Sequence, residues 1–154
     1  MNHWDTHINI HKIDYRGSVC DGPGVRIVVY FQGCNRHCKG CHNPSTWPIG
    51  TGKTMSVATL VQEIEENTVL KRITLSGGEP MLQMDGLLLI VKELNRRGYD
   101  IALYTGCEEK DIPLDIIYNL NYLKCGAYVE ELRTSVSYYG STNQRFIELR
   151  KPSF

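Results

Sequence analysis

One short stretch organises this sequence, and it reads Gly33-Cys34-Asn35-Arg36-His37-Cys38-Lys39-Gly40-Cys41-His42-Asn43. Its three cysteines have the spacing C-x3-C-x2-C, and no fourth cysteine follows at ligand distance. Three thiolates can hold three irons of a [4Fe–4S] cube and leave the fourth iron open to a small chelating ligand. Zinc is the alternative, because His37 or His42 could complete a four-coordinate Cys3His site. Zinc modules usually use two separated ligand pairs, so a single tight loop favours the iron–sulfur cluster.

The composition bounds the rest of the chain. Its 154 residues fit one domain, residues 1–154, with 42% hydrophobic and 22% charged residues. Lys plus Arg equals Asp plus Glu at 17 each, which gives no general attraction to nucleic acid or an anionic membrane. No apolar run reaches the ~20 residues of a membrane span, and the polar N-terminus is not typical of a signal peptide. We therefore expect a cytoplasmic protein with neither nucleic acid nor membrane as partner.

Six cysteines in a cytoplasmic protein are more often metal ligands or catalytic groups than disulfides. Three of them, Cys20, Cys107 and Cys125, stand apart from the motif and have no C-x2-C partner. A free cysteine behaves as a small hydrophobic residue in a protein core. We expect these three to be buried.

Segments typical of strands and helices alternate along the chain. The strand-like segments are 25–31, 72–75, 100–104, 122–124, 127–129 and 146–149, and the helix-like segments are 57–66, 85–97 and 114–120. Ser56 is the expected N-cap of the first helix. Residues 131–145 are expected to form an exposed loop, and His3, His7 and His11 are expected to belong to a polar tail. Alternation predicts an α/β protein with a mainly parallel sheet, and the length allows only part of a barrel that needs about 250 residues. The predicted fold is a partial, open (β/α) barrel.

Chemistry-bearing residues follow three of the predicted strands. The cysteine loop follows 25–31, the run Gly77-Gly78-Glu79-Pro80 follows 72–75, and Tyr104-Thr105-Gly106 ends 100–104. In parallel α/β folds the chemistry lies at the C-terminal edge of the strands. These three segments should therefore share one site.

The cysteine spacing resembles the defining motif of the radical S-adenosylmethionine (SAM) superfamily. Residues 21–26, 31–34 and 41–47 resemble the glycyl-radical-enzyme activases. The run Tyr139-Gly140-Ser141-Thr142-Asn143-Gln144-Arg145-Phe146 resembles the C-terminal part of activating proteins of anaerobic (class III) ribonucleotide reductase. One position departs from the superfamily pattern, because Gly40 stands where many members have an aromatic residue. His42 or Trp47 could supply that aromatic surface instead.

This resemblance implies a radical SAM type of fold and two cofactors, one [4Fe–4S] cluster on Cys34, Cys38 and Cys41, and SAM. The residues that would contact SAM are Gly40, Cys41, His42, Gly77, Gly78, Glu79, Pro80, Tyr104 and Thr105. The glycine-rich run would receive the amino group of the SAM methionine, with Glu79 adding charge or bracing the loop. No catalytic side chain is expected beyond the cluster and SAM.

The resemblance also implies an activity and partners. The implied activity is an activase that reductively cleaves SAM and generates a glycyl radical on an anaerobic ribonucleoside-triphosphate reductase. Its electron donor would be a flavodoxin or a ferredoxin. Two alternatives stay open, an activase of another glycyl radical enzyme such as pyruvate formate-lyase, and a non-enzymatic zinc-binding module.

Overall fold

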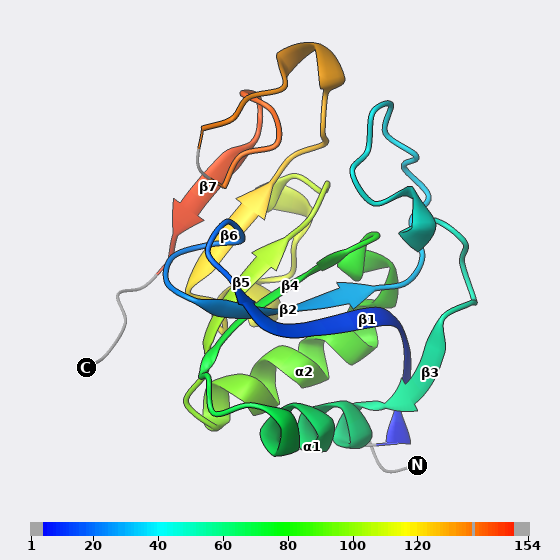
Figure 1. The fold of residues 1–154 in the computed structure, drawn as a ribbon, viewed down its shortest axis with the longest axis vertical. Coiled ribbons are helices and arrows are strands. Elements are labelled where there is room, and N and C mark those ends of the chain that lie inside the picture. Colours follow the sequence, from blue (N-terminus) through cyan, green and yellow to red (C-terminus); the bar gives the residue numbers. More distant parts are fainter. Residues whose placement is uncertain (1–4, 137, 150–154) are drawn as a thin grey trace.

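The computed structural model describes residues 5–136 and 138–149, and within them seven strands form one sheet in the order β3-β1-β2-β4-β5-β6-β7 (Figure 1). The strands are β1 (His7–Ser18), β2 (Arg26–Phe31), β3 (Lys53–Ser56), β4 (Arg72–Gly77), β5 (Asp100–Tyr104), β6 (Tyr122–Cys125) and β7 (Arg145–Glu148). The central strands β2, β4, β5 and β6 pair in parallel. The outer strands β1, β3 and β7 pair antiparallel. The α/β class is confirmed, with the parallel part of the sheet at its centre.

Two helices, α1 (Val57–Asn67) and α2 (Met84–Arg96), cover one face of this sheet (Figure 1). Strand residues alternate between the two faces, so every second side chain of β2, β4 and β5 points to the helices. These side chains form one buried core with the helices, which includes Ile27, Val29, Ile73, Leu75, Ile101, Leu103, Leu60, Ile64, Ile90 and Leu94. Ser56 caps α1 as predicted, because its hydroxyl accepts a hydrogen bond from the backbone N–H of Thr59 at 3.1 Å.

The expectation of a polar tail near the N-terminus is wrong, because residues 7–18 form β1. This strand pairs with β2 on one side and β3 on the other. Ile8 and Ile10 are each 1% exposed, while the residues that alternate with them, His7, Asn9 and His11, face the other way. That period-two alternation is the strand signal, and the spacing of the histidines obscured it. His3 lies outside the described residues.

Other differences lie at the ends of elements. Residues 127–129 are not a strand, because Gly126 takes a positive φ of 103° directly after β6 and the chain leaves the sheet. The third helix, α3 (Leu114–Ile117), is shorter than predicted. Strand β3 was not predicted. None of the helices in the described part of the chain has the length and apolar character of a membrane span.

Arg26 holds the N-terminal ends of the parallel strands together. Its side chain is fully buried, at 0% exposure, on the sheet face opposite the helices. It donates five hydrogen bonds, to the Thr74 hydroxyl, the Pro23 and Ile73 carbonyls, and both the carbonyl and the carboxylate of Asp100. The Nη2–Oδ1 distance to Asp100 is 2.7 Å. A buried guanidinium is stable only when its donors are matched in this way.

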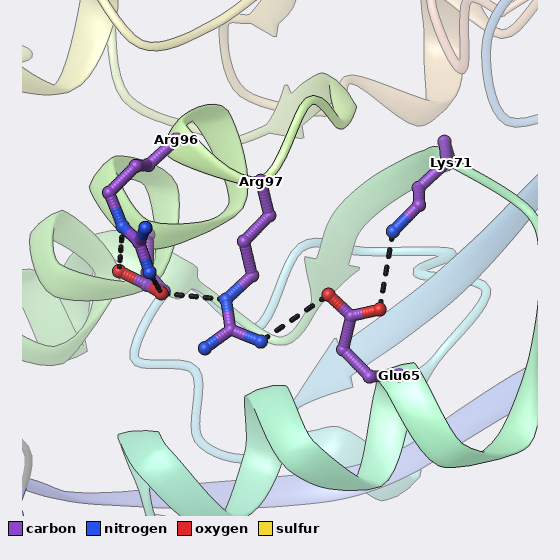
Figure 2. Close-up of polar contacts among 5 residues, drawn as sticks. Glu65, Lys71, Arg96 and Arg97 are labelled. Atoms are coloured by element: carbon purple, nitrogen blue, oxygen red, sulfur yellow. Dashed lines mark hydrogen bonds and ion pairs between the residues drawn. The ribbon is translucent and has the colours of Figure 1, made fainter.

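Charged side chains tie the helices to the same edge of the sheet, as Figure 2 shows. Glu65 on α1 accepts hydrogen bonds from Lys71 at 3.2 Å and Arg97 at 3.4 Å. Arg97 also donates to Glu93 on α2 at 2.6 Å, and Arg96 donates to the same carboxylate. Glu93 is buried, and the hydrogen bonds from Arg96 and then Arg97 lower its pKa. This network links α1, α2 and the start of β4.

Candidate functional site

A pocket opens at the C-terminal edge of the parallel strands, where the three predicted segments meet. Nine of the predicted site residues line it: Cys34, Cys38, Cys41, His42, Gly77, Gly78, Glu79, Tyr104 and Thr105. Gly40 and Pro80 are not among its lining residues. The topology explains the convergence, since β2, β4 and β5 run in the same direction and end at the same edge.

Backbone hydrogen bonds hold the cysteine loop. The N–H of Cys34 donates to the carbonyl of Trp47 at 3.1 Å, and the N–H of Cys41 donates to the carbonyl of Cys38 at 3.0 Å. Cys34 is buried, whereas Cys38 and Cys41 are partly exposed. The Asn43 N–H lies 3.4 Å from the sulfur of Cys41, where it would stabilise a thiolate. Among residues 5–136 and 138–149, no group of three or more His, Cys, Asp or Glu side chains is arranged to hold a single metal ion.

The glycine-rich run packs its backbone directly on the end of β2. The N–H of Gly78 donates to the Phe31 carbonyl at 2.9 Å, and the N–H of Glu79 donates to the Gly33 carbonyl at 2.8 Å. A Cβ atom on Gly78 would lie 2.3 Å from the Gly33 oxygen, and one on Gly77 would lie 2.3 Å from the Phe31 nitrogen. Glycine is therefore required here by the close approach of two backbones.

Glu79 braces the site. Its side chain is 3% exposed, and both oxygens accept hydrogen bonds from protein groups. One oxygen accepts from the Thr105 hydroxyl at 2.6 Å and the Met81 N–H at 3.1 Å. The other accepts from the Gly106 N–H at 2.8 Å and from Arg36 of the cysteine loop at 3.2 Å. Of the two roles expected for Glu79, the geometry favours bracing, because one carboxylate joins β4, β5 and the cysteine loop.

Gly40 takes a positive φ of 74°, and a Cβ there would lie 2.7 Å from the Glu130 carboxylate. A side chain at this position would be strained by the positive φ and would displace the Glu130 carboxylate, and glycine itself offers no aromatic surface. Both residues proposed for that purpose, His42 and Trp47, line the pocket. Trp47 stacks on His37 with ring centroids 4.4 Å apart, and its indole N–H has no acceptor among the described residues.

Lys124 is the most informative residue that sequence reasoning missed. It lies on β6, lines the pocket, and places its ammonium 4.0 Å from the centroid of the Tyr104 ring. Burial lowers the pKa of Lys124 to about 8, against an opposing effect of Asp21. The sequence carried a signal, since a lysine between Leu123 and Cys125 at the end of a parallel strand must face away from the core. Arg36, Tyr128 and Gln144 also line the pocket.

The three remaining cysteines were expected to be buried, and only Cys125 is, at 1% exposure. Cys20 is exposed in the turn after β1. Cys107 is partly exposed, and its sulfur lies 3.2 Å from the Arg36 guanidinium. The expectation is wrong for these two because they follow strand ends, where side chains leave the core.

Comparisons with known proteins agree on a family. Residues 20–147 match a family model described as a 4Fe-4S single cluster domain. The anaerobic ribonucleoside-triphosphate reductase-activating protein of Escherichia coli (strain K12) is 31% identical over 155 aligned residues, which cover 93% of this chain and 100% of that protein.

Other relatives are longer than this chain. The pyruvate formate-lyase-activating enzyme of Listeria monocytogenes is 40% identical over 88 residues, which cover 51% of this chain and 34% of that enzyme. The enzyme of the same name from Clostridium pasteurianum is 40% identical over 101 residues and is covered to 42%. The chain thus spans less than half of these relatives. Among solved structures, QueE from Escherichia coli has a TM-score of 0.53 at 15% sequence identity. The match covers 75% of this chain and 68% of QueE, and at this identity it shows a likeness of the fold alone.

Proposed function

The chain belongs to the 4Fe-4S single cluster domain family, and from that premise we propose that it is a radical SAM activase. It reductively cleaves SAM and generates a glycyl radical on an anaerobic ribonucleoside-triphosphate reductase. The observation that carries this proposal is the pocket in which the three cysteines of the C-x3-C-x2-C loop and the Gly77-Gly78-Glu79 run lie together. The relative of matching length, which is named as the activating protein of that reductase, supports the choice of partner.

The fold proposal is finer than the α/β class. We place the chain among partial, open (β/α) barrels of the radical SAM type, with residues 1–154 as one domain. The parallel order β2-β4-β5-β6 with both long helices on one face supports this placement. So does the likeness of the fold to that of QueE.

The cysteine loop fits an iron–sulfur cluster. Cys34, Cys38 and Cys41 would hold it, and the Asn43 N–H and the unpartnered indole N–H of Trp47 are donors of the kind that sulfur accepts. When bound, the cluster supplies the electron that cleaves SAM. No further side chain is needed as a catalyst.

SAM would lie in the same pocket. His42, Gly77, Gly78, Tyr104 and Thr105 line the wall available to it. Glu79 holds that wall in shape rather than binding the ligand with free oxygens, since each oxygen already accepts two hydrogen bonds. Gly40 and Pro80 contribute through their backbone, by setting the path of their loops.

The remaining partners are proposed from the family resemblance. The electron donor is a flavodoxin or a ferredoxin, and the setting is the cytoplasm. The balance of 17 basic and 17 acidic residues supports neither nucleic acid nor membrane as a partner. Activation of pyruvate formate-lyase is the second candidate, because its activating enzymes share 40% identity with part of this chain.

Electron paramagnetic resonance (EPR) on the anaerobic protein tests the proposal. The protein is reconstituted with iron and sulfide, reduced, and measured with and without SAM. We expect a [4Fe–4S]⁺ signal that changes shape on adding SAM. Incubation with each purified partner should then produce a glycyl radical on the reductase and none on pyruvate formate-lyase. Uptake of zinc without formation of a cluster would contradict the proposal and favour the alternative of a non-enzymatic zinc-binding module.

A further inference from the structure

One buried donor at the cysteine pocket has no acceptor, the indole N–H of Trp47. Its nitrogen is shielded from solvent, and no hydrogen-bond partner for it lies among the described residues. An indole N–H can only donate, and a buried donor that is left without an acceptor destabilises the fold. The acceptor of this N–H is therefore best sought in a ligand of the pocket that Trp47 lines.

Backbone hydrogen bonds fix Trp47 beside the first cysteine of the motif. The N–H of Cys34 donates to the Trp47 carbonyl at 3.1 Å. One residue earlier, the N–H of Gly33 donates to the Thr46 carbonyl at 2.6 Å. The N–H of Trp47 itself donates to the Pro44 carbonyl at 3.1 Å. The place of Trp47 is thus set by the same contacts that set the place of Cys34.

The indole ring is held by the cysteine loop as well. It stacks on the His37 ring, with centroids 4.4 Å apart and an angle of 16° between the planes. His37 stands between Cys34 and Cys38 in the sequence. One face of the indole is therefore already covered by an aromatic ring, and the stack fixes the plane in which the N–H points.

The acceptors that suit this N–H are sulfurs. Each carboxylate oxygen of Glu79 already accepts two hydrogen bonds, and the Thr46 carbonyl accepts from Gly33. The three cysteines of the motif line the same pocket as Trp47. Thiolates and sulfides of an iron–sulfur cluster accept hydrogen bonds from the protein, and these bonds help to set its reduction potential.

We propose that the Trp47 indole N–H donates a hydrogen bond to a sulfur of the bound cluster, either a sulfide or a cysteine thiolate, and so makes the cluster easier to reduce. The inference rests on the proposed function. Reduction adds one negative charge to the cluster, and a donor at a sulfur stabilises the more negative state. Trp47 is thus a positioning residue that acts through the cluster.

The first test measures the reduction potential of the anaerobic, cluster-loaded protein without SAM, for wild type and Trp47→Phe. Phenylalanine keeps an aromatic ring beside His37 but has no N–H. We expect the ratio of reduced to oxidised cluster at a fixed potential to fall about tenfold, which is a midpoint about 59 mV lower for a one-electron couple. Tyr15→Phe is the matched control, because the Tyr15 hydroxyl is also buried without a partner but lies outside this pocket lining. Its midpoint should equal that of wild type.

A second test needs no substitution in the protein that is measured. The protein is produced with tryptophan labelled with nitrogen-15 in the indole ring, loaded with cluster and reduced. Pulsed EPR then measures the coupling of that nitrogen to the electron spin of the [4Fe–4S]⁺ cluster. We expect a coupling in wild type and none in Trp47→Phe, in which the other of the two tryptophans still carries the label.

The outcomes separate this inference from the function on which it rests. A Trp47→Phe midpoint equal to that of wild type, or a labelled wild type without a nitrogen-15 coupling, would overturn the inference and leave the proposed function intact. A midpoint that differs only when SAM is present would assign the N–H to SAM and would also overturn it. A wild-type protein that forms no [4Fe–4S] cluster would overturn the proposed function itself.

Discussion

The two edges of the four parallel strands each hold a buried or partly buried cation, and they use it differently. At the N-terminal edge the guanidinium of Arg26 is fully buried and donates five hydrogen bonds to the strands around it. At the C-terminal edge the ammonium of Lys124 lies over the Tyr104 ring and has neither an ion pair nor a hydrogen bond among the described residues, although the Asp21 carboxylate acts on it through space. The cation at the N-terminal edge has its hydrogen-bond partners within the protein, whereas the cation at the C-terminal edge has none among the described residues. Substitutions at the first edge should therefore change stability, and those at the second should change binding.

The largest effect should follow from Cys34→Ser at the ligand-binding edge. Serine keeps the size of the side chain but is a poor ligand for iron, so we expect loss of cluster iron and no measurable glycyl radical. Because Cys34 lies outside the sheet core, thermal unfolding of the metal-free protein should change little. Iron per chain, EPR and circular dichroism measure these outcomes.

Cys20→Ser is the matched control, since Cys20 is exposed and does not line the cysteine pocket. It should retain iron. A Cys34→Ser protein that unfolds completely would show that this loop stabilises the fold. It would contradict the expectation that substitutions at this edge change binding rather than stability.

Arg26→Leu should give the largest loss of stability. The change leaves the Asp100 carboxylate and several strand carbonyls without donors inside the sheet. Breaking a buried ion pair in this way costs about 3–5 kcal/mol in the free energy of unfolding. Denaturant unfolding measures it, and the folded fraction should still bind S-adenosylhomocysteine with wild-type affinity. Weakened binding at unchanged stability would reverse the roles of the two edges.

Glu79 is an exception to this comparison, because its carboxylate braces the structure although it lies at the C-terminal edge. The variant Glu79→Gln tests that bracing role. A glutamine amide cannot accept from both pairs of donors that Glu79 serves, so at least one buried donor loses its partner. We expect a loss of about 1–3 kcal/mol in the free energy of unfolding. Glu131→Gln is the control, because the Glu131 side chain is 69% exposed. If Glu79→Gln lowers ligand affinity without lowering stability, Glu79 binds the ligand rather than bracing its wall.

Glu93→Gln should have the smallest effect, about 1 kcal/mol at neutral pH, since its partner Arg96 is largely solvated and its partner Arg97 is partly solvated. The hydrogen bond from Arg96 holds the pKa of Glu93 below its ordinary value of 4.5. Its contribution is therefore present above that value and is lost as pH falls through the lowered pKa. Unfolding measured from pH 7 to pH 3 should show the wild type and the variant converging in acid. A difference that stays constant with pH would exclude this carboxylate as its source.

Most of the parallel centre was predictable, because β2, β4 and β5 are short apolar runs that each end in a chemically distinctive segment. The antiparallel flanks were not. Strand β1 carries only two fully buried residues, Ile8 and Ile10, between polar ones, and its burial depends on pairing with both β2 and the unpredicted β3. Such pairing brings together residues far apart in sequence, which local patterns do not encode.

The site was predictable to the extent that its residues sit in motifs. The pocket gathers the three cysteines with Gly77, Gly78 and Tyr104, as the strand-edge argument required. The role of Glu79 was not decidable from sequence, since bracing depends on Thr105, Gly106 and Arg36 being within reach. Lys124 was missed although its place between Leu123 and Cys125 turns it away from the core, because its position in the pocket depends on the pairing of β6 with β5.

The backbone contact between Gly78 and Gly33 has a consequence for how this chain can change over generations. A clash with a side chain can be relieved by a compensating substitution at the neighbour, but the Gly78 Cβ would strike a main-chain oxygen, which every residue carries. A selection for suppressors of Gly78→Ala should therefore return reversion to glycine and few second-site changes. We therefore expect the backbone conformations of the cysteine loop and the glycine-rich run to be kept together as the sequence changes, because no pair of side-chain substitutions can relieve this contact.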